Sequence, residues 1–320
     1  MDKIISVAPM MDWTDRHCRY FHRLLAPSVT LYTEMVTANA LIHGDVDRHL
    51  RYSASENPVI LQLGGSEPDK LAESVKIAEP YGYDEYNLNC GCPSDRVQSG
   101  AFGACLMAEP VLVGQSIKAM QSATDKPVTV KCRIGIDDAD EQQMLRDFIR
   151  IVSEYGCKTF IIHARKAWLN GLSPKENREV PPLDYELVKA IKAENPHLNI
   201  QINGGLTDIQ QMRDLWNDVD GFMIGRAAYH SPRILIDIEK QFYNSDWAIN
   251  DEAVIKKMID YANEQYETYQ TPVKTITKHM VNFYQGVAGA RKWRQIISEK
   301  AHTVTKAEDV LWPAFDSVTQ

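Results

Sequence analysis

The chain has 320 residues, of which 44% are hydrophobic and 24% charged, so a sizeable core is possible and global disorder is excluded. No apolar run of about 18 residues and no secretory pattern in the first nine residues is present, which predicts a cytoplasmic protein without a membrane span. Taken alone, the net charge of −8 argues against binding to nucleic acid, which favours basic proteins. The six cysteines form no CxxC pair, and we expect reduced thiols.

Eight short apolar runs bounded by turn residues predict strands, and most are apolar on both faces as in a buried parallel sheet. They are residues 4–8, 31–34, 59–63, 85–89, 128–133, 159–163, 199–203 and 221–224. Helical spacing lies between and after them, in residues 70–79, 111–122, 141–155, 183–194, 208–216 (with Thr207 as a plausible N-cap) and 234–243. Eight such units favour a (β/α)8 TIM barrel, and an open doubly wound sheet is the alternative.

Helical spacing without strands follows the eighth unit, in residues 252–269, 274–284 and 291–302. We therefore predict two domains, a catalytic barrel of residues 1–244 and a small helical domain of residues 245–320. The segment 271–300 carries six Lys or Arg residues against one Glu, so the second domain has a local basic surface on an acidic protein.

Glycine-rich turns end the last two predicted strands, in Asn203-Gly204-Gly205 and in Gly225-Arg226. Glycine lets backbone N–H groups approach a phosphate, and the loops after strands seven and eight are the usual phosphate site of a TIM barrel. Two such loops and the cation of Arg226 favour phosphate binding, whereas the alternative is that these glycines only make tight turns.

Two cations end the fifth predicted strand, where alternation places Lys131 and Arg133 on the same face. Buried cations are costly unless they meet anions, and a reduced flavin carries negative charge that a lysine would stabilise. The alternative is an ion pair with a carboxylate such as Glu34. His163 ends the sixth strand, and it is equally consistent with a functional group or with a hydrogen-bonded polar cap.

The loop Asn89-Cys90-Gly91-Cys92-Pro93 follows the fourth predicted strand and presents Cys92. A thiol is mostly protonated at neutral pH and can act as a general acid. A single Cys can also be a small buried hydrophobe, and we assign that role to Cys132 and Cys157. No second Cys pair accompanies the Cys-x-Cys, so we expect no metal site.

Together these motifs resemble the tRNA-dihydrouridine synthase family over nearly the whole chain. The stretch from Asn89 to Leu106 is the specific part, and residues 86–97 look most like the bacterial subgroup that modifies positions 20 and 20a of the tRNA D-loop. The other matching segments are Ala8-Pro9-Met10, Thr14-Asp15, Gln62-Leu63-Gly64, Lys131-Cys132-Arg133, His163-Ala164-Arg165, Asn203-Gly204-Gly205 and Gly225-Arg226.

The resemblance implies an enzyme that reduces uridine to dihydrouridine with FMN, and with NADPH as electron donor. Hydride would pass from FMN to C6 of the uracil, and Cys92 would give a proton to C5. Asn89 and Arg133 fall where the family contacts the uracil. The flavin ring would lie against Ala8, Pro9, Met10, Gln62, Lys131 and His163, and the phosphate on Asn203, Gly204, Gly205, Gly225 and Arg226.

The expected macromolecular partner is tRNA, and no obligate protein partner is implied. We predict phosphate contacts from Arg291 and Arg294, which share a helix face, and from Lys175 and Arg178 in the loop after the sixth strand. Trp293 is expected in the core. Solvated surface charge is the alternative for the basic residues. A flavin barrel acting on a small pyrimidine and a non-catalytic RNA-binding barrel are the alternatives for the whole protein.

Overall fold

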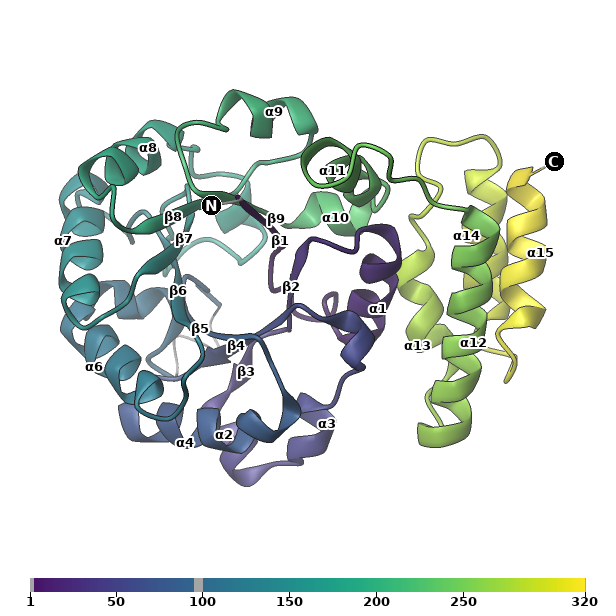
Figure 1. Cartoon of the computed structure of the whole chain (residues 1–320), viewed down its shortest axis with the longest axis horizontal. Coiled ribbons are helices and arrows are strands. Elements are labelled where there is room, and N and C mark those ends of the chain that lie inside the picture. Colours follow the sequence, from purple (N-terminus) through teal and green to yellow (C-terminus); the bar gives the residue numbers. More distant parts are fainter. Residues whose placement is uncertain (1–2, 95–99, 320) are drawn as a thin grey trace. The chain divides into compact units, whose positions relative to one another are not determined.

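Eight parallel strands close into a barrel, which confirms the predicted TIM-barrel class. The computed structural model describes residues 3–94 and 100–319. The barrel strands are β1 (Ile4–Val7), β2 (Thr30–Tyr32), β4 (Val59–Gly64), β5 (Glu85–Cys90), β6 (Val128–Arg133), β7 (Thr159–His163), β8 (Asn199–Asn203) and β9 (Gly221–Ile224). Each pairs with the next in this order, and the ring closes because β9 pairs with β1 (Figure 1).

The second predicted strand differs from the structure, because it ends at Tyr32 instead of Glu34 and a short β3 (Val36–Thr37) follows. β2 pairs with the first residues of β4, whereas β3 pairs with Leu63 and Gly64 at its end. In the gap, the Thr33 side chain accepts a hydrogen bond from the backbone N–H of Gln62 at 3.1 Å. A side-chain bond thus replaces part of the ladder there.

Helices cover the outside of the barrel in Figure 1 and lie in the connections between its strands. In this part of the chain they are α2 (Ala38–His43), α3 (Val46–Leu50), α4 (Pro68–Ala78), α6 (Pro110–Gln121), α7 (Glu141–Glu154), α8 (Tyr185–Glu194) and α9 (Ile209–Asp214). The predicted N-cap of α9 is wrong by one residue: Asp208 accepts from the backbone N–H of Gln211, in a capping box.

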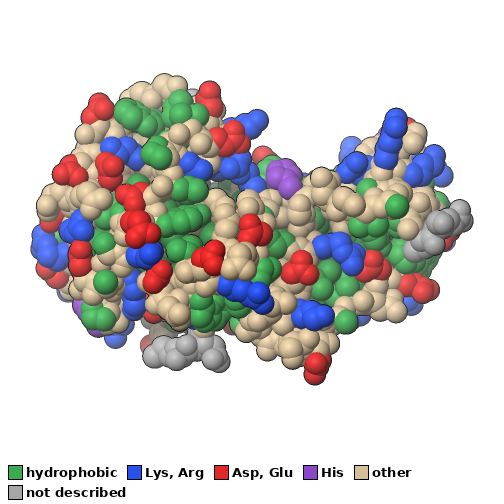
Figure 2. All heavy atoms as spheres, turned by 90° about the horizontal axis from the view of Figure 1, so that it is seen from above, with side chains coloured by type: hydrophobic (Ala, Val, Ile, Leu, Met, Phe, Trp, Pro, Cys, Tyr) green, Lys and Arg blue, Asp and Glu red, His purple; other side chains and the backbone are tan. Residues whose placement is uncertain are grey.

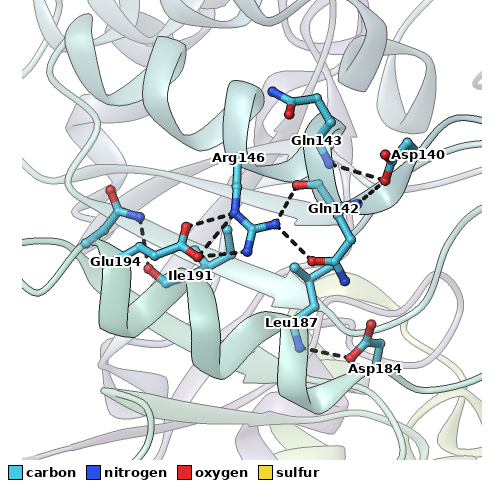
Figure 3. Close-up of polar contacts among 9 residues, drawn as sticks. Asp140, Gln142, Gln143, Arg146, Asp184, Leu187, Ile191 and Glu194 are labelled. Atoms are coloured by element: carbon cyan, nitrogen blue, oxygen red, sulfur yellow. Dashed lines mark hydrogen bonds and ion pairs between the residues drawn. The ribbon is translucent and has the colours of Figure 1, made fainter.

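Neighbouring helices α7 and α8 are joined by a two-pronged ion pair between Arg146 and Glu194 (Figure 3). Both helices begin at an aspartate. Asp140 accepts from two N–H groups of the first turn of α7, and Asp184 accepts from that of Leu187 in α8. The caps fix where the loops that lead from β6 and β7 enter these helices.

The packing divides the chain into two compact units, the first of which contains all the strands and comprises residues up to Met11 and Thr30–Gly225. The second unit comprises Asp12–Val29 and the chain from Arg226 on. It is helical, with α1 (Arg16–Leu25), α10 (Arg226–His230), α11 (Ile234–Phe242), α12 (Asp251–Tyr269), α13 (Val273–Thr277), α14 (Ala290–Lys300) and α15 (Glu308–Thr319). The predicted domain boundary at residues 244 and 245 stays a prediction.

The second unit corrects one predicted helix and confirms the place of Trp293. The helix expected over residues 274–284 ends at Thr277 and continues only as a 3-10 turn through Met280. Tertiary hydrogen bonds hold that turn, since His279 bonds Asp15 and the fully buried Trp293 donates to the Met280 carbonyl. No helix in the described part of the chain is long and apolar enough to cross a membrane. Acidic and basic side chains are interspersed on the face shown in Figure 2.

Candidate active site

The predicted functional residues of the barrel gather at the carboxyl ends of neighbouring strands. The register places Arg133 of β6 beside His163 of β7, and His163 beside Asn203 of β8. Two residues before Arg133 on β6, Lys131 lies beside Asn89 of β5. Four strands therefore bring these side chains to one edge of the barrel, which is where TIM-barrel enzymes place their active sites.

The loop that presents Cys92 is held by the side chain of Asn89. The Asn89 Oδ1 atom accepts hydrogen bonds from the backbone N–H groups of Gly91 and Cys92, at 3.1 and 3.0 Å. The Cys92 carbonyl accepts from the N–H of Ala104 at 2.9 Å, which ties the far side of the loop. The thiol donates to the Ser94 hydroxyl at 3.5 Å and is half-buried, so part of it is accessible. The hydrogen bonds of the Cys92 backbone fix its position.

Cys90, in contrast, is fully buried behind the site, and burial raises the pKa of its thiol well above the usual value. Cys132 and Cys157 are also fully buried, with thiol pKa values raised by burial, as expected of small core residues. Of the two cysteines in the Cys-x-Cys sequence, only Cys92 is partly exposed. In the described part of the chain, no three His, Cys, Asp or Glu side chains cluster as metal ligands would.

Arg133 joins three backbone segments around the site and is only 3% exposed. Its Nε donates to the Gly91 carbonyl at 3.1 Å, and its Nη1 to the carbonyls of Lys166 and Asn177 at 3.1 and 2.7 Å. Burial lowers the pKa of Arg133 to about 10, so it stays charged at neutral pH. The guanidinium thus links the Cys92 loop with the loop that follows β7.

Asn177, which the sequence reasoning did not select, organises the loop after β7. It is completely buried, and its side chain accepts from the Trp168 N–H and donates to the Trp168 and Leu172 carbonyls. Its own carbonyl is the closest of the three acceptors of Arg133. A buried Asn in a polar loop has no periodic signal, so only its contacts reveal it.

Lys131 makes no hydrogen bond or ion pair with any residue that the structure describes, so the ion pair expected as the alternative is not formed. Burial, followed by the neighbouring charge of Arg133, lowers the pKa of Lys131 to about 8. Burial and the nearby cations also hold the pKa of His163 well below its usual value, so the ring is neutral. An unpaired cation beside a neutral imidazole is an environment suited to an anionic ligand.

The turn after β8 has the backbone that glycine alone adopts readily, with φ angles of +105° at Gly204 and +69° at Gly205. A Cβ atom on Gly204 would come within 2.4 Å of the His163 ring, and one on Gly205 within 2.4 Å of Leu183. The N–H groups of both glycines make no hydrogen bond with the described residues, so they remain available as donors. The Asn203 amide instead donates to the Met223 carbonyl at 2.7 Å, so its Nδ2 joins the last two strands.

The segment after β1 lies beside the turn after β9. The Ala8 N–H donates to the Ile224 carbonyl at 2.7 Å, and a Cβ on Gly225 would lie 3.8 Å from Ala8 and 3.9 Å from the Met10 sulfur. Pro9 and Met10 are half-buried, and Met10 packs on the apolar core of the barrel. Gln62 is buried and bonds Asn87 and Asn89 through its amide, both at 2.8 Å. Among the segments predicted to contact the flavin, Ala8 and Met10 therefore lie near Gly225, and Gln62 is bonded to Asn89.

A family model for dihydrouridine synthases matches residues 6–319. The chain belongs to the dihydrouridine synthase family. The match covers both units, and it favours this family over barrel enzymes that act on small pyrimidines. The resemblance drawn from the motifs is thereby confirmed.

Dihydrouridine synthases from several bacteria are about half identical to this chain. A tRNA-dihydrouridine(20/20a) synthase of Vibrio parahaemolyticus is 50% identical over 321 residues, covering 98% of this chain and 96% of the relative. One from Escherichia coli K12 is 54% identical over 299 residues, covering 93% and 86%. Among solved structures, an old yellow enzyme homologue from Zymomonas mobilis has a TM-score of 0.55 at 10% identity, covering 78% of this chain and 90% of that one, and shows the shared fold.

The residues predicted to contact RNA lie in two places of this dihydrouridine synthase. Lys175 and Arg178 are exposed, in and beside a 3-10 turn of the loop after β7 that Asn177 organises. On α14 of the helical unit, Arg291 is exposed, and Arg294 is half-buried with a hydrogen bond to Gln285 at 3.0 Å. Their contact with RNA stays a prediction.

Sequence reasoning missed three polar residues inside the barrel below Asn89. Glu85 and Asn87 stand on the same face of β5 as Asn89, and Thr129 stands on the same face of β6 as Lys131 and Arg133. The sequence does show polar residues at every second position of β5 and β6, two strands whose other positions are mostly apolar. Only the cross-strand register shows that these residues meet.

Proposed function

We propose that this dihydrouridine synthase reduces uridine to 5,6-dihydrouridine in the D-loop of tRNA, at positions 20 and 20a, with FMN as cofactor and NADPH as electron donor. Support for the positions comes from relatives that carry the name tRNA-dihydrouridine(20/20a) synthase at about half identity. The observation that carries the chemistry is the half-buried Cys92 thiol held at the carboxyl ends of the strands, with the charges of Lys131 and Arg133 near it.

The residues at this edge fit FMN. The unpaired Lys131 would face the electron-rich side of the ring, while Gln62, His163 and the segment from Ala8 to Met10 would line it. The N–H groups of Gly204 and Gly205, which have no partner among the described residues, suit the phosphate. Asn203 precedes them in the chain, and Gly225 and Arg226 would add to the site from the end of β9. When bound, FMN would supply the hydride that C6 of the uracil accepts, with NADPH as its source.

The chain's own part in the reaction is to hold the uracil and to deliver a proton. Cys92 would give its Sγ proton to C5, and an extruded base is needed because the thiol cannot reach a stacked one. Arg133 uses Nε and Nη1 on backbone carbonyls, and Nη2 makes no hydrogen bond with the described residues. Nη2 could therefore donate to a uracil carbonyl, and the second hydrogen of the Asn89 Nδ2 could do the same.

The tRNA backbone would be bound by Arg291 and Arg294 of the helical domain, residues 245–320, and by Lys175 and Arg178 of the barrel domain, residues 1–244. Lys175, Arg178 and Arg291 are exposed and Arg294 is half-buried, and phosphate recognition needs no more than well-placed cations. A basic helix on an acidic protein is the feature that favours RNA over a small substrate.

The test is the formation of dihydrouridine in unmodified tRNA by the FMN-loaded enzyme with NADPH, with the modified positions mapped. Cys92→Ala should lose about 10² to 10⁴ in rate, as expected for a missing general acid, and should keep its flavin and its reduction by NADPH. Cys90→Ala is the matched control and should stay active, because that thiol is buried behind the site. Activity on free uracil compounds but not on tRNA, or an active Cys92→Ala, would refute the proposal.

A further inference from the structure

A chain of side-chain hydrogen bonds, buried up to Thr129 and ending at the half-buried Glu85, runs through the barrel from the Cys92 loop. Asn89 Nδ2 donates to Gln62 Oε1 at 2.8 Å, and Gln62 Nε2 donates to Asn87 Oδ1 at 2.8 Å. Asn87 Nδ2 then donates to the Thr129 hydroxyl at 2.9 Å. The chain ends where that hydroxyl donates to Glu85 Oε1 at 2.6 Å.

Every bond of the chain points the same way. Each amide donates toward Glu85 and accepts from the side of Cys92, and the first acceptor, Asn89 Oδ1, receives the N–H groups of Gly91 and Cys92. Turning over the amide of Gln62 or Asn87 would set donor against donor and acceptor against acceptor. Hydrogen bonds in such a series polarise and strengthen one another in a low-dielectric interior. The chain therefore has a single arrangement, and it determines which end of Asn89 meets the loop.

This series of hydrogen bonds does more than fill the interior of the barrel. Gln62, Asn87 and Thr129 are each 2% exposed or less, and buried polar groups contribute little stability even when they are fully bonded. Elsewhere the same interior is filled by apolar side chains, among them Ile60, Ile161 and Met223. Apolar residues would thus serve packing equally well on β4, β5 and β6, so the polar series calls for another reason.

We propose that this chain, anchored on Glu85, positions Cys92 for proton donation, with Thr129 and Asn87 as positioning residues that act through Gln62 and Asn89. The inference rests on the proposed function, in which Cys92 is the proton donor. Thr129 does not touch the loop itself, so its effect has to pass along the bonds. Breaking the Thr129 link leaves Asn87 without its acceptor and releases the amides above it to rotate.

Thr129→Val removes the link while keeping the shape of the side chain, and Thr129→Ser restores the hydroxyl. The control is Thr124→Val, because the Thr124 hydroxyl also donates to a glutamate at 2.6 Å, Glu79 Oε1, but takes no part in this series of hydrogen bonds. Thr129→Ala is the second variant if Thr129→Val does not fold. All are compared as holoenzymes with equal flavin content.

The first measurement is hydrogen exchange of the Gly91 and Cys92 amides, resolved to single residues and without tRNA. Thr129→Val should exchange both amides about tenfold faster, the change expected for losing roughly one buried hydrogen bond, while Thr129→Ser and Thr124→Val stay near the parent. The second measurement is the steady-state rate with tRNA. In Thr129→Val, kcat should fall about tenfold and the KM for tRNA should stay within about twofold.

If the hydrogen exchange of the two amides is unchanged in Thr129→Val, the series of hydrogen bonds does not hold the Cys92 loop. Faster exchange with an unchanged kcat would show that the loop position does not matter to the reaction, and an equal loss in Thr124→Val would show a general effect on stability. Each of these results would overturn the inference. A parent enzyme that forms no dihydrouridine in tRNA would instead overturn the proposed function, which the exchange experiment does not depend on.

Discussion

Replacing Arg133 by Lys separates the positive charge at this position from the shape of the guanidinium. Lys keeps the charge that would act on a uracil carbonyl. It cannot reach the Gly91, Lys166 and Asn177 carbonyls together, which Arg133 bonds through two nitrogens at 2.7 to 3.1 Å. We expect Arg133→Lys to destabilise the folded protein even in the absence of substrate and flavin.

The expected size follows from the three bonds. A hydrogen bond with a charged donor contributes about 1.5–3 kcal/mol, and the ammonium of Lys can satisfy one of the three carbonyls. Losing the other two gives about 3–6 kcal/mol, and the lower end applies if water reaches the carbonyls that are left. We therefore expect the free energy of unfolding to fall by about 3 kcal/mol, which would lower the urea midpoint by roughly 1 M.

The assay is urea unfolding of the flavin-free protein, with Arg133→Met as the variant that lacks the charge as well. Arg133→Met should be destabilised at least as much as Arg133→Lys, because it satisfies none of the three carbonyls. If Arg133→Lys instead unfolds at the same urea concentration as the parent, the three bonds contribute nothing measurable. The role of Arg133 would then be its charge alone.

Three other predictions concern the flavin, the RNA and the pH. Lys131→Ala should raise the Kd for FMN about tenfold or slow flavin reduction, because a charged contact is lost. If the FMN titration and the reduction kinetics are both unchanged, the role of Lys131 is structural. Replacing Arg291 and Arg294 together should weaken tRNA binding and reduce the slope of log K against log salt by about 1.5, with FMN content as the control; an unchanged slope would place the RNA elsewhere. Burial lowers the pKa of His17 from 6.5 to about 4, so the unfolded chain binds the extra proton between these values and stability falls as the pH drops through that window. The loss should reach about 3 kcal/mol by pH 4, and His17→Gln should flatten the pH dependence of unfolding; an unchanged pH dependence would show that His17 is not buried in its neutral form.

Much of the barrel can be read from the sequence because its strands are local signals. The last four barrel strands were predicted to the residue, since each is an apolar run between turn residues. The places of Cys92, Lys131 and the glycines at carboxyl ends of strands were also predictable, because the strands of a parallel barrel all end at one edge. Their roles in the reaction stay predictions.

Tertiary structure decided what those residues bond to. The helix expected over residues 274–284 breaks after Thr277, where His279 meets Asp15 from a distant segment. Arg133 was expected to meet substrate, yet its Nε and Nη1 are taken by backbone carbonyls of other loops. Asn89 points one end of its amide at the Cys92 loop because a series of bonds beginning at Glu85 orients it. Hydrogen-bond partners across strands depend on register and on loop closure, which bring together residues far apart in the chain, and no local pattern encodes them.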